Sequence, residues 1–104
     1  MDASQRPPLT LDDLRARRNE ILAIARRHRA FNVRVIGSVA RGSATPDSDV
    51  DFLVSFAPGA TLIHHSGLRL DLIDLLGVKV DVISDHSGLT PAFRQRVERE
   101  AVSL

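Results

Sequence analysis

Residues 33–51 of the 104-residue chain read Val-Arg-Val-Ile-Gly-Ser-Val-Ala-Arg-Gly-Ser-Ala-Thr-Pro-Asp-Ser-Asp-Val-Asp. An apolar run ends in Gly37-Ser38, and two carboxylates spaced i, i+2 then open a second apolar run. Glycine after a strand lets the backbone turn tightly and approach a ligand closely. A helical turn beginning at Ser38 would point unsatisfied N–H groups outward, which suits a phosphate. The stretch therefore predicts strand, tight turn and strand, with an anion site beside a cation site.

The cation site is predicted from Asp49 and Asp51, which share one face of the second strand because side chains alternate along a strand. Two like charges so close are costly unless a cation joins them. Mg²⁺ binds one or two carboxylates together with phosphate oxygens and several waters. Asp-x-Asp alone also fits a solvent-facing edge, and Gly-Ser alone also fits an ordinary turn. Their occurrence together favours a phosphate and metal site.

A third carboxylate, Asp81, stands in the otherwise apolar run 78–83. A lone aspartate there needs a hydrogen bond, a metal or an edge position. If its strand lies beside the second strand, three carboxylates can hold two cations. Asp81 is then expected to be the base that activates an acceptor hydroxyl for in-line attack on an α-phosphorus.

Other polar residues near the turn have more than one interpretation. Arg41 is expected to bring charge to a terminal phosphate. Ser43 offers a further hydroxyl that could reach a phosphate. Asp47 either extends the acidic cluster or is a turn residue after Pro46.

The rest of the chain alternates predicted helices with predicted strands. Thr10 caps a first helix and Thr90 caps the last, while Gly67 interrupts the third helical segment and leaves its first half open to being a loop. The third segment is predicted to place Leu68, Leu72 and Leu76 in the core. The predicted helices span 10–29, 38–41, 61–76 and 90–101, and the predicted strands span 33–36, 49–56 and 78–84.

The order α-β-α-β-α-β-α predicts an α/β fold, a small mixed sheet of about three strands covered by helices. The first two strands are expected to be antiparallel, because their connection is too short for a long crossover. Residues 1–9 are expected to form a flexible lead, and residues 10–104 a single domain.

Composition narrows the class of protein. The chain has no cysteine, which excludes disulfides and thiolate metal sites, and no apolar stretch of membrane-spanning length, so a cytoplasmic protein is expected. Net charge is only +1, so direct nucleic-acid binding is not expected. The charge is uneven, because residues 1–34 contain eight arginines and four acidic residues. The basic first helix is either a solvated face or a docking face for an acidic partner or RNA.

The four histidines are expected to be peripheral. His64 and His65 are adjacent and point about 100° apart on a helix, so they do not readily share a metal. They are expected to be surface or loop residues, with a partner or nucleotide contact as the alternative. His28 and His86 are expected at the surface.

The combined motif resembles the nucleotidyltransferase superfamily that includes DNA polymerase β. The similarity covers about residues 10–104 and is greatest to the minimal nucleotidyltransferase domains that are antitoxin partners of HEPN-domain ribonucleases. The resemblance implies ATP and Mg²⁺, with two ions, as cofactors. It implies Asp49, Asp51 and Asp81 as the metal-binding and catalytic residues, and Gly37, Ser38, Arg41 and Ser48 as nucleotide contacts. It is carried by Gly37-Ser38-Val39-Ala40-Arg41-Gly42, Ser48-Asp49-Val50-Asp51 and Val80-Asp81-Val82.

The resemblance implies transfer of AMP from ATP to a tyrosine hydroxyl of a HEPN toxin, which silences the toxin. The chain contains no tyrosine, so a tyrosine acceptor must come from another molecule. The chain is also expected to be too short for an acceptor-binding domain of its own. Two alternatives stay open: a non-catalytic antitoxin that masks its partner by binding, and a nucleotidyltransferase that acts on a small molecule or an RNA end.

Overall fold

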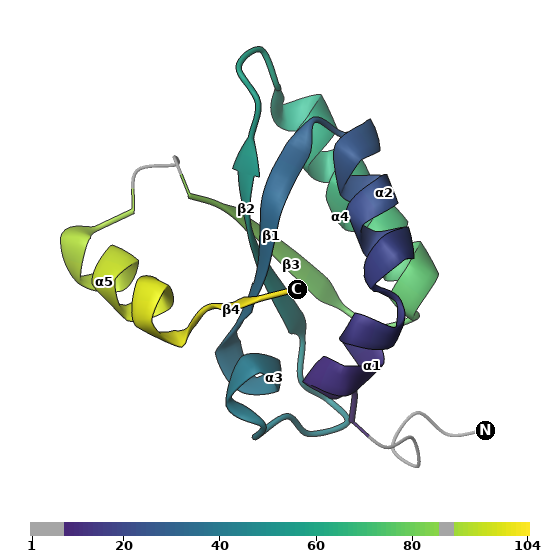
Figure 1. Ribbon diagram of the computed structural model, residues 1–104, viewed down its shortest axis with the longest axis vertical. Coiled ribbons are helices and arrows are strands. Elements are labelled where there is room, and N and C mark those ends of the chain that lie inside the picture. Colours follow the sequence, from purple (N-terminus) through teal and green to yellow (C-terminus); the bar gives the residue numbers. More distant parts are fainter. Residues whose placement is uncertain (1–7, 86–88) are drawn as a thin grey trace.

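The computed structural model describes residues 8–85 and 89–104. Its centre is a four-stranded mixed sheet in the order β3-β2-β1-β4 (Figure 1). β1 pairs antiparallel with both β2 and β4, and β2 pairs parallel with β3. The predicted α/β class, mixed sheet and antiparallel first pair are confirmed, and a short fourth strand extends the sheet. The strands are β1 Ala30–Ile36, β2 Val50–Phe56, β3 Val80–Ser84 and β4 Val102–Ser103.

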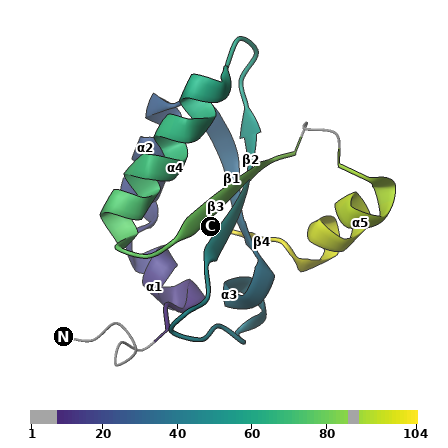
Figure 2. The same cartoon turned by 180° about the vertical axis from the view of Figure 1, so that it is seen from behind.

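Helices cover the two faces of the sheet unequally. α2 and α4 lie side by side on one face, whereas α5 stands on the other face and α3 lies at one end of β1 (Figures 1 and 2). The main core fills the space between the sheet and the α2–α4 layer. Its fully buried members include Leu14, Ile21, Val35, Val50, Phe52, Val54, Leu68 and Leu72. The helices are α1 Leu11–Ala16, α2 Arg18–Arg27, α3 Gly37–Arg41, α4 Leu62–Leu76 and α5 Pro91–Glu100.

The single helix predicted over 10–29 is wrong, because the chain breaks at Arg17 (φ −108°, ψ 19°) into α1 and α2. The Arg17 N–H bonds to the carbonyl of Leu14 at 3.0 Å, which tightens the turn. The Arg17 guanidinium donates to the carbonyl of Leu75 at 2.6 Å and fixes the break against the end of α4. The predicted cap at Thr10 is present, reinforced by a reciprocal bond with Asp13.

Gly67 does not shorten α4, which is continuous from Leu62 to Leu76. Gly67 instead makes room for His28, because a Cβ built on it would lie 2.7 Å from His28 Cε1. The His28 Nε2 atom lies 2.6 Å from Asp71 Oδ2, so this pair joins the end of α2 to α4. The surface position expected for His28 is therefore corrected to a packed one, with 21% of the side chain exposed. His86 lies outside the described residues.

The second face of the sheet carries a smaller apolar cluster. Ile36 and Leu53 pack there against Val97 of α5, and the chain then enters β4. Leu68 and Leu72 are buried as predicted, whereas Leu76 is only partly buried at the rim of the main core. Within residues 8–85 and 89–104, every helix is too short or too polar to cross a bilayer.

Candidate active site

The strand register brings together two of the three predicted carboxylates. Asp51 on β2 is in register with Asp81 on β3 and, across the antiparallel pair, with Ile36 on β1. Neighbouring strands lie about 4.8 Å apart, so side chains in register leave the sheet side by side. Leu53, two residues after Asp51, packs in the cluster under α5. Asp51 therefore points to the face opposite the α2–α4 layer.

Asp49 lies just before β2, which begins at Val50, and not on the strand as predicted. The N–H of Val50 donates to the carbonyl of Lys79 at 3.0 Å. Pairing with the β3 segment therefore begins at Val50, one residue after Asp49. Asp49 is exposed, as is Asp81, whereas Asp51 is half-buried. The acidic cluster thus has one sheltered member and two open ones.

Gly37 sits directly against the Asp51 carboxylate. Its φ of +76° is in the left-handed region, and a Cβ built on it would lie 2.4 Å from Asp51 Oδ2. β1 therefore turns into α3 at a position where both the backbone conformation and the neighbouring carboxylate require glycine. Ser38 follows in the first turn of α3, and Gly42 (φ +75°) ends that helix.

The electrostatics of the cluster are unfavourable for three bare carboxylates. Burial raises the pKa of Asp51, the negative charges of Asp81 and Asp49 raise it further, and Arg41 acts in the opposite direction. A divalent cation would relieve this repulsion, and carboxylate oxygens are the donors that Mg²⁺ prefers. In the described part of the chain no three acidic, histidine or cysteine side chains are gathered as a ready metal site. The in-register carboxylates of Asp51 and Asp81 suit an ion such as Mg²⁺, which needs only one or two carboxylates and completes its shell with phosphate oxygens and water.

The remaining predicted contacts have distinct surroundings. Arg41 is exposed on α3, and its Nη1 lies 3.3 Å from Glu100 Oε2. The Ser48 hydroxyl accepts from the N–H of Thr45 at 2.8 Å and so shapes the loop that delivers Asp49. Ser43 and Asp47 are both exposed, and Asp47 lies in the turn of that loop, which favours its interpretation as a turn residue.

A charged cluster that was not predicted from the sequence lies farther along the same face of the sheet. Asp85 Oδ2 accepts from Arg34 Nη2 at 2.9 Å and from the hydroxyl of the buried Ser55. A register shift between Phe31 and Arg34, with Asn32 at φ +51°, accompanies this arrangement. Asparagine is one of the residues that most often adopt a positive φ in place of glycine, so Asn32 is the feature of the sequence that could have indicated a bulge.

The two adjacent histidines belong to the framework of α4. The His65 Nε2 atom lies 2.7 Å from the carbonyl oxygen of Val82, and its ring stacks on Phe56 with centroids 5.4 Å apart. His64 Nδ1 accepts from the N–H of Thr61 at 3.0 Å and completes the cap of α4. Both residues lie on helix α4 and are half-buried, so the loop alternative is wrong, whereas the surface position expected for them is a partly exposed one.

Comparison with known proteins identifies the family. The family model of the nucleotidyltransferase domain matches residues 18–103. A solved structure described as a candidate minimal nucleotidyltransferase is 52% identical, with a TM-score of 0.82 over 92% of this chain and 97% of that one. The protein adenylyltransferase MntA of Thermococcus cleftensis is 41% identical over 69% of this chain and 75% of its own length.

A more distant likeness shows the fold alone. It is to a chain from the complex of the tri-AMPylated HEPN toxin of Shewanella oneidensis with its MNT antitoxin, at 19% identity. The TM-score is 0.63 over 86% of this chain and 69% of that one. From the family match and the close relatives, together with the glycine turn set against paired strand carboxylates, the chain belongs to the nucleotidyltransferase domain family.

Proposed function

We propose that this protein is a Mg²⁺-dependent adenylyltransferase that transfers AMP from ATP to a tyrosine hydroxyl of a partner HEPN-domain toxin and so neutralises it in the cytoplasm. The observation that carries the proposal is the contact of Gly37 with Asp51, in register with Asp81. On this proposal the phosphates bind at the Gly37 turn, directly beside the cation held by Asp51 and Asp81. The names of the adenylyltransferase relative and of the toxin–antitoxin complex support the choice of reaction and partner.

The proposed roles of the site residues begin with binding of the cation and the nucleotide. Asp49 and Asp51, with Asp81, would hold Mg²⁺, which when bound offsets the negative charge of the triphosphate. The backbone at Gly37 and Ser38 would contact the phosphates, and Arg41 would add positive charge. The loop held by Ser48 presents Asp49 to the same place.

Asp81 is assigned as the base because its carboxylate is exposed beside Asp51. The tyrosine oxygen attacks the α-phosphorus, and its proton passes to the Asp81 carboxylate. The new bond joins the tyrosine oxygen to the α-phosphorus, the bond to the β-phosphate bridging oxygen breaks, and pyrophosphate leaves. Chain residues need only align the reactants and hold the charge that develops, as is general for phosphoryl and nucleotidyl transfer.

The acceptor side is assigned to another protein because the 104-residue sequence contains no tyrosine. Asp49 and Asp81 are also exposed, and Asp81 lies on the face of the sheet opposite the α2–α4 layer. A tyrosine side chain of a partner could reach such a site from solvent.

The test uses ATP labelled at the α-phosphate, with Mg²⁺, the purified protein and its HEPN toxin. Label should appear on a toxin tyrosine, whereas ATP labelled at the γ-phosphate should leave none. Asp51→Asn should abolish labelling, and Asp74→Asn, at an exposed position on α4, should not.

Two outcomes would contradict the proposal. Neutralisation of the toxin without label would favour a non-catalytic antitoxin that masks its partner. Label on a small molecule or an RNA end in the absence of toxin would favour the other alternative.

A further inference from the structure

The C-terminal end of α5 is held more firmly than its beginning. Phe93, in the first turn, is 36% exposed, whereas Val97 is buried against the sheet. Immediately after α5, Val102 of β4 pairs with Val35 of β1. Glu100 lies between these two attachments, so its backbone position is fixed relative to β1 and the turn that follows it.

The Glu100 carboxylate contacts two arginines, one with each oxygen. Oε2 lies 3.3 Å from Nη1 of Arg41 on α3, and Oε1 lies 3.7 Å from Nε of Arg96, one turn earlier on α5. Glu100 is thus the contact between α5 and the guanidinium assigned to phosphate. Within residues 8–85 and 89–104, Nη1 is the one nitrogen of the Arg41 guanidinium in contact with a side chain, and a guanidinium carries five N–H donors in a planar fork. The other donors stay available for an anion.

Arg41 interacts with two carboxylates, by direct contact with Glu100 at 3.3 Å and through its charge with Asp51. Its charge also acts on Asp51, whose pKa it lowers against the effects of burial and of the other aspartates. If Arg41 moved onto Asp51, it would cancel the negative charge that a cation requires, and it would be withdrawn from the phosphates. The Glu100 carboxylate, in contact with Nη1 of Arg41, opposes that movement.

We propose that Glu100 is a positioning residue that holds Arg41 on the α5 side, so that Asp51 is left to the cation and Arg41 to the phosphates. The kinetic part of this assignment rests on the proposed function, whereas the effect on cation binding does not. A partly exposed ion pair is weak, so the expected effects are modest, about two- to fivefold.

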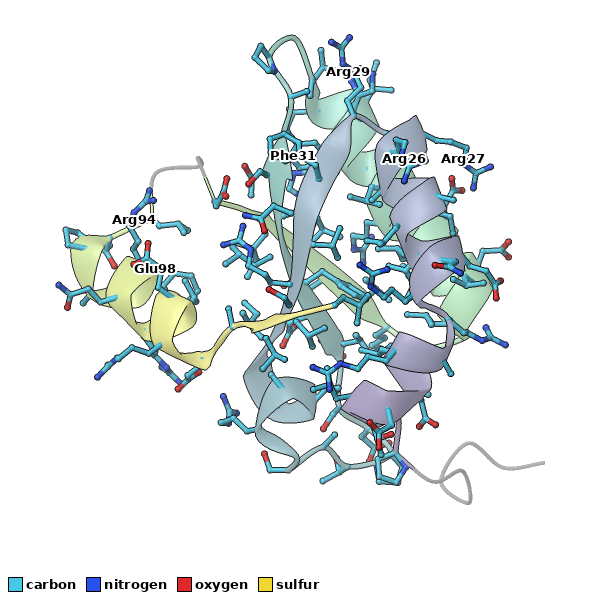
Figure 3. All side chains as sticks on the ribbon, viewed as in Figure 1. Arg26, Arg27, Arg29, Phe31, Arg94 and Glu98 are labelled. Atoms are coloured by element: carbon cyan, nitrogen blue, oxygen red, sulfur yellow. The ribbon has the colours of Figure 1, made fainter. Side chains whose placement is uncertain are left out.

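The first experiment measures Mn²⁺ binding to the full chain by electron paramagnetic resonance, without toxin or nucleotide. Glu100→Gln should weaken binding about two- to fivefold, because the freed Arg41 competes for Asp51. Glu98→Gln is the matched control, since it removes the same charge from an exposed position on α5 (Figure 3). It should change Mn²⁺ binding by less than Glu100→Gln does.

Measuring Mn²⁺ binding in the Arg41→Gln background separates the positioning of Arg41 from the general electrostatic effect of the Glu100 charge. There Glu100→Gln should have no more effect than Glu98→Gln, because no guanidinium is left to hold. An equal loss of Mn²⁺ affinity with and without Arg41 would overturn the proposal. Thermal unfolding of each variant checks that the fold is intact.

The second experiment measures AMP transfer to the toxin. Glu100→Gln should raise KM for ATP about two- to fivefold with a smaller change in kcat, and Glu98→Gln should leave both unchanged. If the wild-type protein transfers no AMP but the Arg41-dependent loss of Mn²⁺ affinity is seen, the positioning role stands and the proposed function fails. If transfer occurs and Glu100→Gln matches Glu98→Gln in both experiments, the positioning role is wrong.

Discussion

The Asp51 carboxylate lies so close to Gly37 that a Cβ on this glycine would approach Asp51 Oδ2 to 2.4 Å. The turn and the acidic site are therefore in contact, and neither can be changed without the other. Gly42 offers a matched comparison, because it has nearly the same φ (+75° against +76°) but nothing within 4 Å of the position its Cβ would take.

Gly42→Ala should cost about 1–2 kcal/mol of unfolding free energy, from the left-handed backbone alone. Gly37→Ala should cost more and should also weaken Mn²⁺ binding, because the added methyl group must displace Asp51. Urea unfolding and Mn²⁺ titration of the two variants measure both effects. Equal losses of stability together with unchanged Mn²⁺ binding in both would show that the contact with Asp51 has no consequence.

The raised pKa of Asp51 predicts a pH dependence of stability in the metal-free protein. The folded state binds the proton more tightly than the unfolded state, so the contribution of this carboxyl is most favourable below its unfolded pKa. The contribution is lost as pH rises through the folded pKa. Asp51→Asn should remove this loss and be more stable than wild type at neutral pH in EDTA.

Denaturant unfolding between pH 3 and pH 8 measures this difference, with Asp74→Asn, at an exposed position on α4, as the control. Saturating Mg²⁺ should reduce the difference in unfolding free energy between wild type and Asp51→Asn, since the cation favours the charged carboxylate. If Asp51→Asn unfolds at neutral pH, the residue has a structural role that the carboxylate cluster does not explain.

Replacing Gly67 tests the contact between α2 and α4. Alanine inside a helix is normally about 1 kcal/mol better than glycine. At position 67, however, its methyl group would lie 2.7 Å from His28 Cε1, and overpacking of this kind costs about 1–3 kcal/mol.

Gly67→Ala should therefore be neutral or destabilising in the wild-type background, whereas in a His28→Ala background it should stabilise by about 1 kcal/mol. A double-mutant cycle by thermal unfolding gives the sign directly. The same sign in both backgrounds would remove His28 as the reason for glycine here.

The assignment of Asp81 as base predicts a loss confined to the chemical step. Asp81→Asn should lower kcat for AMP transfer about 10²- to 10⁴-fold. Because Asp81 is exposed, the thermal stability of the variant should stay near that of wild type. Single-turnover labelling separates a slower chemical step from a defect in ATP binding. A rise in KM for ATP with kcat intact would assign Asp81 to nucleotide binding instead.

Much of the fold and site could be predicted because the signals are local. Gly37, the two aspartates that follow and the apolar runs around them fix the strand-turn-strand order and the short connection. The apolar run about Asp81 predicts a strand, and placing it beside β2 puts Asp81 next to Asp51.

What could not be predicted depends on contacts between distant residues. The break at Arg17 is fixed by a carbonyl of Leu75, fifty-eight residues away. Gly67 looks like a helix breaker until His28 occupies the space above it. Glu100 is one of several charged residues on α5, and it lies beside Arg41 because Val97 packs on the sheet and β4 pairs with β1. β4 itself is two residues long, too short for any periodicity to show.

The parallel pairing of β2 with β3 has a consequence for how the protein becomes active. Asp51 and Asp81 meet only after the whole of α4 has crossed over the sheet and docked, because parallel strands cannot be joined by a tight hairpin. A growing polypeptide that has emerged only as far as α4 would carry Gly37, Asp49 and Asp51 but not Asp81, the proposed base. Placement of Asp81 beside Asp51 is therefore a late event in folding, because it requires that β2, α4 and β3 have all formed.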